Sequence, residues 1–341
     1  MSKDAGRTEM ALLDVEVNSF HRFSLDRLSV TPELLGATHR FTYEDKDIVL
    51  SIPKADKDSV PFDQRRVHCW KWKAEGNVPL EYSVYSIDLE IELKKPLRIP
   101  EAVMQRPPNQ FELIGDEEQK RLNSTVSDAA ELAKKGFEYW LSVIRWKSGI
   151  GHIGEPQVRY ASDQGGGAVL RERATGHRVW LQPRIVLVIG NKPVSLAQWE
   201  ATQKALSAGK APPIWFGFLF DSEQRANNSD ITGSILSLAI ALEVNVRRVF
   251  SHGLEHTEPV VLEVLDQANL RSLLNRIKKH SYWNDDWKDA TNLSAFNELM
   301  TCRDRIMHSA QTDDIDVKEL RKMQAAVKRF AYFTCDFLGL S

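Results

Sequence analysis

The sequence predicts an α+β protein of two domains, in which a β-rich N-terminal domain with one long helix precedes an all-α helical bundle. Three observations lead to this fold class. Over residues 82–93 apolar and polar residues alternate, which is typical of a strand with one buried face. Over residues 116–146 apolar residues recur at helical spacing. Beyond residues 209–213, a Gly- and Pro-containing break, every patterned segment is helical.

Strands are expected first. Residues 13–17 alternate at period two, and residues 41–43 and 48–52 flank a polar Glu-Asp-Lys-Asp turn, which predicts a hairpin. The long helix follows, with Leu122, Ala133 and Trp140 on its apolar stripe. Further strands are expected at residues 157–161, 168–173, 178–182 and 184–189.

The second half of the chain is expected to be helical. Ser195 is a suitable N-cap for a helix over residues 196–206. We assign residues 13–215 to a β-rich regulatory or sensor domain and residues 216–341 to a helical domain. Helices are expected at residues 213–225, 231–250, 260–277, 294–308 and 315–337.

Composition narrows the class of protein. The 341 residues suit two domains, and 42% hydrophobic and 27% charged residues are ordinary for a globular protein. No apolar run approaches the roughly 18 residues of a membrane span, and the polar N-terminus lacks the apolar core of a signal peptide. Three widely spaced cysteines favour a reducing compartment. We therefore expect a cytoplasmic protein without membrane contact.

The stretch Arg303-Asp-Arg-Ile-Met-His308 lies within the helix expected over residues 294–308. A guanidinium is a permanent cation that holds phosphate oxygens bidentately, and an imidazole can exchange a proton near neutral pH. Together they could cut a phosphodiester without a metal. On one straight helix, however, five residues separate two side chains by about 140°, so Arg303 and His308 do not share a face.

Residues 212–341 resemble a HEPN domain (higher eukaryotes and prokaryotes nucleotide-binding). The signature of that family is Arg, a polar residue, a short spacer and His, which Arg303, Asp304 and His308 match with a four-residue spacer. The context agrees: an apolar helix containing Ala241-Leu242-Glu243 precedes the motif, and a last helix follows it. The resemblance covers only the last 130 or so residues.

The resemblance implies an antiparallel helical bundle, a homodimer in which two copies of the motif meet, and metal-independent ribonuclease activity. It implies that the ribose 2′-OH attacks phosphorus, that His308 acts as base or acid, that Arg303 holds the phosphate, and that Asp304 orients either one. In bacteria such architectures look like anti-phage or abortive-infection systems. We expect RNA and a second copy of the chain as partners, and neither a cofactor nor a resident metal.

RNA contact must rest on a local patch, because the net charge is −2 and the chain from Asp221 onward carries 15 Lys+Arg against 18 Asp+Glu. Tyr282, Trp283 and Trp287 could stack on bases, although core packing is the commoner use of such residues. The residues expected to contact nucleic acid are Arg305, Arg271, Arg276, Lys278, Lys279, Arg321 and Lys328.

Each feature also has a structural interpretation. Arg303 could be a solvated residue and His308 a helix cap. Glu243 could pair with Arg247 four residues on, or hold Arg303. His252 and His256 have the spacing of metal ligands, but the neighbouring Gly253 favours a helix C-terminus.

Two other stretches suggest no chemistry. His68-Cys69 reads as part of a strand, and the glycine-rich residues 163–167 fit neither phosphate-loop template. The rival to the ribonuclease hypothesis is a non-catalytic, homodimeric helical module for binding or assembly.

Overall fold

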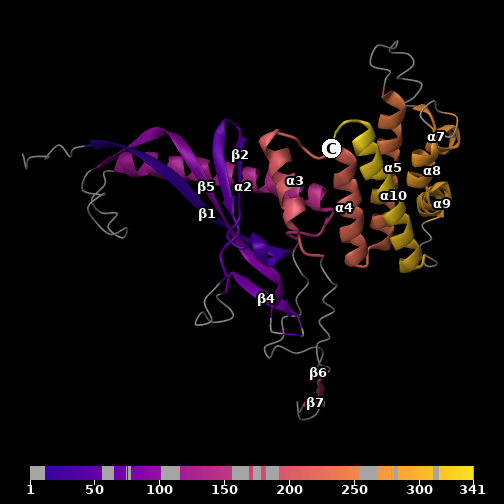
Figure 1. The fold of residues 1–341 in the computed structure, drawn as a ribbon, viewed down its shortest axis with the longest axis horizontal. Coiled ribbons are helices and arrows are strands. Elements are labelled where there is room, and N and C mark those ends of the chain that lie inside the picture. The colour runs from indigo at the N-terminus through magenta and orange to yellow at the C-terminus, as the bar shows by residue number, and fades with distance from the viewer. Residues whose placement is uncertain are drawn as a thin grey trace, which may run out of the picture. The chain divides into compact units, whose positions relative to one another are not determined.

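The computed structural model describes residues 12–55, 65–73, 75, 78–100, 116–155, 169–171, 178–181, 192–252, 267–277, 279, 283–309 and 315–340. The chain forms an antiparallel sheet in its N-terminal region and mostly helices after it, so the α+β class is confirmed (Figure 1). It divides into two compact units. One comprises Met1–Leu141 with Ile153–Gly209, and the other comprises Ser142–His152 with Lys210–Ser341.

The first unit is built on a five-stranded antiparallel sheet in the order β1-β5-β3-β2, with β4 also paired to β5. A 3-10 helix, Pro32–Leu34, follows β1. A separate pair, β6 and β7, forms a two-stranded ribbon. The strands are β1 Leu12–Val30, β2 Thr38–Tyr43, β3 Lys46–Ser51, β4 Val67–Trp72, β5 Pro79–Pro100, β6 Val169–Arg171 and β7 Arg178–Leu181.

The expected hairpin is confirmed as β2 and β3. Its two turn residues, Glu44 and Asp45, both have positive φ, which matches the twist of paired strands in a two-residue connection. The first strand is longer than the five residues expected, because β1 pairs with β5 as far as Val30 through two register shifts. Such irregularities interrupt the period of two and hide a strand's length from a pattern search.

Helix α2, Asp116–Ser148, covers one face of this sheet (Figure 1). Phe137 stacks on Phe23 of β1 with ring centroids 4.4 Å apart. At Gly136 the helix passes so close to β3 that an added Cβ would lie 2.5 Å from Ile48 Cδ1. The buried residues of the sheet on this side are Phe41, Ile48, Leu50, Ile87, Leu89 and Ile91.

Helix α3, Leu196–Ser207, closes the edge of the sheet. The expected N-cap is confirmed, because Ser195 and Gln198 form a reciprocal capping box. Further along, the Gln203 side chain accepts from Arg40 N and donates to Arg40 O. These bonds occupy backbone groups of edge strand β2 that would otherwise be open to pairing with another chain.

The second unit contains the last turns of α2 and the C-terminal helices. Helix α5 packs against α4, α7, α9 and α10 around fully buried Phe216, Phe296 and Phe330. A buried network crosses this core: Gln324 donates to the hydroxyls of Ser222 and Ser234. The helices are α4 Ile214–Asn227, α5 Ile231–Ser251, α7 Leu270–Ile277, α8 Asp285–Ala290, α9 Leu293–Ser309 and α10 Val317–Phe337.

Within the part of the chain that the structure describes, no helix is both long and apolar enough to span a membrane.

Candidate functional site

Helix α9 carries the Arg303/Asp304/His308 motif at its C-terminal end. Its first half is anchored in the core by Phe296, Leu299 and Met300, which are almost fully buried. From Arg303 onward the side chains are half-buried or exposed. The motif therefore lies where the helix leaves the core, so its polar groups reach solvent without an unpaired charge being buried.

Asp304 connects two guanidinium groups. Arg271 of α7 donates from Nη2 to Asp304 Oδ2 at 3.1 Å, and Arg303 donates from Nη1 to Asp304 Oδ1 at 3.4 Å. Arg271 Nη2 also donates to the Thr301 hydroxyl at 3.2 Å. The side chains of Arg271, Arg303 and Asp304 are 42%, 38% and 39% exposed. The cluster carries a net charge of +1 at a surface open to an anion.

His308 is exposed one turn beyond Asp304. Residues four apart on a helix are neighbours on its surface, whereas Arg303 and His308 are five apart. Among the described residues His308 has no hydrogen-bond or ion-pair partner, and the neighbouring Met307 is 62% exposed. Within one copy of the chain, the imidazole therefore shares a face with the carboxylate and not with the guanidinium.

The structure distinguishes between the alternative roles of Glu243 and His252. Glu243 accepts from Arg247 at 2.7 Å, so the local pair is confirmed, and Arg247 also donates to Ala268 O. His252 is confirmed as the C-cap of α5, where its ring meets Phe337 edge-on. His256 lies outside the described residues. In the described segments no three His, Cys, Asp or Glu side chains form a group that could hold a metal ion.

The residues expected to contact nucleic acid have different surroundings. Arg271 is occupied by Asp304, as above. Arg321 donates to Asn227 of α4 and to Gln324 of its own helix, and Lys328 forms an ion pair with Glu223 of α4. Both side chains therefore connect α10 to α4. Exposed positions are occupied by Arg276, Lys279 and Arg305, of which Arg305 has further interactions. Lys278 lies outside the described residues.

The three aromatic residues that could stack on bases also have different surroundings. Trp287 of α8 is 3% exposed and meets Phe330, Phe333 and Phe337 edge-on, which confirms core packing. Trp283 is half-buried, and Tyr282 lies outside the described residues.

The cysteines suit a structural role. Burial raises the pKa of the Cys302 thiol, and it raises the pKa of Cys335 to about 11, so neither is activated as a nucleophile. His68 and Cys69 are confirmed as part of strand β4. Residues 163–167 lie outside the described residues.

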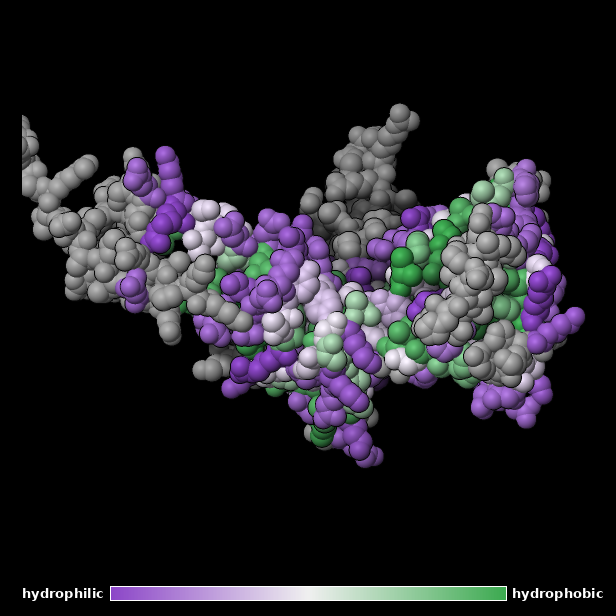
Figure 2. All heavy atoms as spheres, turned by 90° about the horizontal axis from the view of Figure 1, so that it is seen from above, coloured by the Kyte–Doolittle hydropathy of each residue, from purple (hydrophilic) through white to green (hydrophobic). Residues whose placement is uncertain are grey.

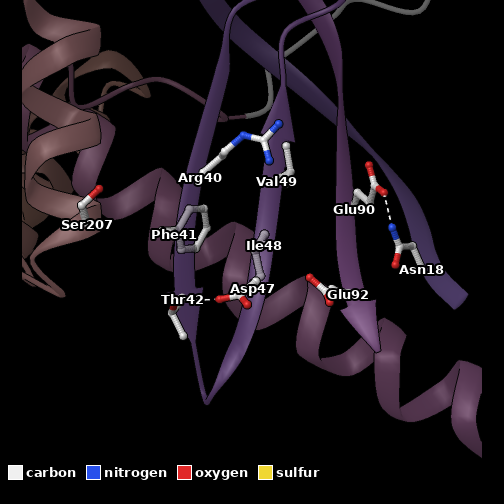
Figure 3. Close-up of a pocket in the computed structure, with 10 residues that line it drawn as sticks. All are labelled: Asn18, Arg40, Phe41, Thr42, Asp47, Ile48, Val49, Glu90, Glu92 and Ser207. Carbon is white, nitrogen blue, oxygen red and sulfur yellow. Dashed lines mark hydrogen bonds between the residues drawn. The ribbon is translucent and has the colours of Figure 1, made fainter. Parts of the chain in front are cut away.

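The first unit has a hollow of its own, of about 600 Å³, which Figure 3 shows. Its polar side chains alternate along the strands with the buried ones that meet α2, so it lies on the other face of the sheet. It holds Arg40 with the carboxylates of Asp47, Glu90 and Glu92. Asn18 donates to Glu90 and Thr42 donates to Asp47. One cation against three carboxylates does not suit a nucleic-acid backbone.

Comparison of the chain with protein-family models, with curated proteins and with solved structures gives no match. The sequence pattern did not reveal the bond from Arg271 to Asp304, because 33 residues separate them and Arg271 belongs to a different helix. In the sequence, Arg271 stands out only as part of a basic cluster, and that cluster suggested contact with nucleic acid instead.

Proposed function

We propose that the helical unit is a HEPN-like, metal-independent endoribonuclease. The observation that carries the proposal is the surface end of α9, where Asp304 holds two guanidinium groups beside an exposed imidazole. This arrangement supplies a fixed cationic group for a phosphate and a proton-exchanging group within one short segment.

The proposed reaction is an internal transfer at phosphorus. The ribose 2′-OH loses its proton to one His308 imidazole, a 2′-O–P bond forms, and the bond from phosphorus to the 5′-oxygen breaks. The leaving oxygen takes a proton from an imidazolium, which leaves a 2′,3′-cyclic phosphate and a 5′-OH. Arg303 stabilises the charge that develops on the phosphate oxygens. Asp304 keeps the guanidinium in position.

A second copy of the chain completes the proposed site. Arg303 and His308 point about 140° apart on one helix, so two α9 helices related by a twofold axis would bring the Arg of one protomer toward the His of its partner. Met307, 62% exposed between them in sequence, would pack in that interface. Figure 2 shows further hydrophobic patches on the surface of the helical unit, whose exposed apolar residues include Ile214 and Ile240.

The biological role we propose is toxin-like bacterial defence in the cytoplasm, in which RNA cleavage stops growth and the β-rich unit restrains the nuclease. This role rests on the similarity of the motif to the HEPN signature and on the position of the helical unit after a β-rich region.

Met307 also favours the rival function, a non-catalytic homodimeric module. In that case Arg271, Asp304 and Arg303 would serve as interface residues only. A measurement of RNA cleavage distinguishes the two functions, because a binding or assembly module would dimerise without cutting RNA.

Incubation of the purified full chain with total RNA in EDTA tests the proposal. Fragments ending in 2′,3′-cyclic phosphate are expected, and DNA, which has no 2′-OH, should stay intact. His308→Ala should lower the rate by about 10²–10⁴-fold, and Arg303→Lys should also be damaging because a point charge cannot reproduce the planar fork.

Asn297→Ala, at an exposed position of the same helix, is the matched control and should cut at the wild-type rate. The proposal fails if His308→Ala cuts RNA as fast as wild type, or if EDTA abolishes cleavage and Mg²⁺ restores it.

A further inference from the structure

The opposite end of α9 faces a hollow of about 610 Å³ that the motif does not reach. One wall is formed by the C-terminal end of α8 and the start of α9, and the other wall by α10. His308 is 15 residues further along α9, which corresponds to about 22 Å. The volume falls within the range of about 300–1,000 Å³ that small-molecule sites occupy.

The α10 wall has a regular composition. Lys322, Ala325, Ala326 and Arg329 line the hollow at positions i, i+3, i+4 and i+7, so they form one stripe along the helix. The two alanines leave space between two long cationic side chains. Both cations are exposed, and among the described residues neither has a hydrogen-bond or ion-pair partner. Their charges are therefore available to a ligand.

The facing wall adds the N-terminus of a 17-residue helix. Asn292 caps it by accepting from Ala295 N at 3.1 Å. The aligned peptide dipoles of such a helix place about half a positive charge at its first turn, and its first N–H groups point out of the helix. An anion is favoured at this position.

Thr291, which also lines the hollow, provides an independent observation. It is 7% exposed, yet its hydroxyl has no hydrogen-bond partner among the described residues. A buried hydroxyl without a partner is unfavourable by about 1–3 kcal/mol relative to a bonded one. The oxygen itself is closed to solvent, so the side chain would rotate about χ1 to meet an acceptor oxygen bound in the hollow.

The charges of the hollow favour an anion over a cation. Lys288, Lys322 and Arg329 face one carboxylate, that of Asp289. Lys288 is already paired with Asp285 at 2.7 Å, so Lys322 and Arg329 supply most of the free positive charge.

We propose that this hollow binds the phosphate monoester group of a nucleotide-sized small molecule. Lys322 and Arg329 hold two sides of the phosphate, Thr291 donates its hydroxyl once its side chain has rotated, and the start of α9 supplies the favourable dipole. The site is separate from the Arg303/His308 motif, so its ligand would act on the same helix from the other end.

Isothermal titration calorimetry on the full chain tests this, with inorganic phosphate and adenosine 5′-monophosphate as probes and adenosine as the uncharged comparison. Both phosphates should bind, more weakly as salt rises, and adenosine should not. The double variant Lys322→Gln/Arg329→Gln should weaken binding by about tenfold or more, because charge-assisted bonds are lost.

Lys318→Gln is the matched control, since it removes one charge from an exposed position on α10 that does not line the hollow. It should bind like wild type. Thr291→Val should weaken binding by about three- to tenfold while leaving the melting temperature unchanged or raised, because the hydroxyl it removes has no hydrogen-bond partner among the described residues.

His308→Ala and Arg303→Lys should bind phosphate normally, so failure of the ribonuclease proposal leaves this one standing. The inference is overturned if neither phosphate binds, or if Lys318→Gln weakens binding as much as the double variant. It is also overturned if a short RNA without terminal phosphate binds at these residues and the two small phosphates do not.

Discussion

At the scale of single residues, Asp304 has the most consequential position on α9. Its two oxygens accept from guanidinium groups of two different helices, Arg271 on α7 and Arg303 on α9. All three side chains are about 40% exposed. Ion pairs at such exposure contribute little to stability, at most about 1 kcal/mol, because water screens them. We therefore expect this carboxylate to act mainly by orienting Arg303 rather than by stabilising the fold.

Asp304→Ala should accordingly lower the free energy of unfolding by less than about 1 kcal/mol. Under the proposed ribonuclease function it should also lower RNA cleavage by about tenfold or more, because Arg303 loses its fixed direction. Urea unfolding followed by circular dichroism measures the first, and RNA cleavage in EDTA measures the second. Glu298→Ala, at an exposed acid on the same helix, should change neither. A loss of several kcal/mol in Asp304→Ala would assign the carboxylate a structural role instead.

His39 is a second residue with a measurable signature. It is fully buried, accepts from Trp140 Nε1 through Nδ1 and bonds Trp199 O through Nε2. These partners fix the neutral ring with its proton on Nε2. Burial lowers the pKa of His39 to about 4, and the backbone bond to Trp199 raises it only partly back.

Because the folded-state pKa of His39 is depressed, acid should destabilise the first unit. Above about pH 6.5 the ring is neutral in both states, and between pH 6.5 and 4 the unfolded chain takes up a proton that the folded chain does not. The free energy of unfolding should fall by about 2 kcal/mol from pH 7.5 to 5. Urea unfolding over that range should show the slope, and His39→Gln should flatten it. An equal slope in the variant would assign the effect to other groups.

Burial also lowers the pKa values of His21 and His68, which would add to the slope in the same direction. Both residues remain in His39→Gln. The difference between the two proteins therefore isolates His39.

At the scale of elements, local sequence patterns predict many of the helices and strands. The β2–β3 hairpin, the Ser195 cap and the long helices follow from alternation, a serine before an apolar run, and helical spacing, which are all properties of neighbouring residues. Helix α8 was missed because it has only six residues and opens with the polar Asn284-Asp-Asp stretch, which reads as a connector. Asn284 is in fact its N-cap, bonded to Trp287 N.

In the candidate site, too, contacts between neighbouring residues are predictable from the sequence, and contacts between distant helices are not. The motif itself is local, and so is the Glu243–Arg247 pair four residues apart. The bond from Arg271 to Asp304 and the hollow between α8 and α10 depend on how helices distant in sequence pack. No spacing rule within one helix encodes such contacts, so sequence patterns could not have predicted them.

At the scale of the whole molecule, the helical unit includes a segment from far up the chain, Ser142–His152. Trp146 within it is 1% exposed and lies near Phe216, with ring centroids 6.2 Å apart. The Tyr332 hydroxyl donates to Trp146 O at 2.6 Å, and Lys147 lies 3.6 Å from the centre of the Trp146 ring. At Gly151 an added Cβ would lie 2.5 Å from Phe220 Cδ1, so the backbone itself is closely packed there.

The C-terminal helices should therefore need this segment for full stability. A fragment of residues 210–341 should be helical but melt at a lower temperature than the helical unit of the full chain, because removing a buried Trp alone is worth about 3–5 kcal/mol. Adding a peptide of residues 138–155 should raise the melting temperature of the fragment in proportion to the logarithm of peptide concentration once the peptide is in excess, since it binds the folded form.

Thermal melting by far-ultraviolet circular dichroism measures both effects. A peptide with Trp146→Ala is the control and should give little stabilisation, because it keeps the backbone and loses the side chain that packs near Phe216. If the fragment melts as cooperatively and at as high a temperature as in the full chain, and the peptide changes nothing, Ser142–His152 is only a passive connection. A response to the wild-type peptide alone would instead show that the helical core is assembled from two separated parts of the sequence.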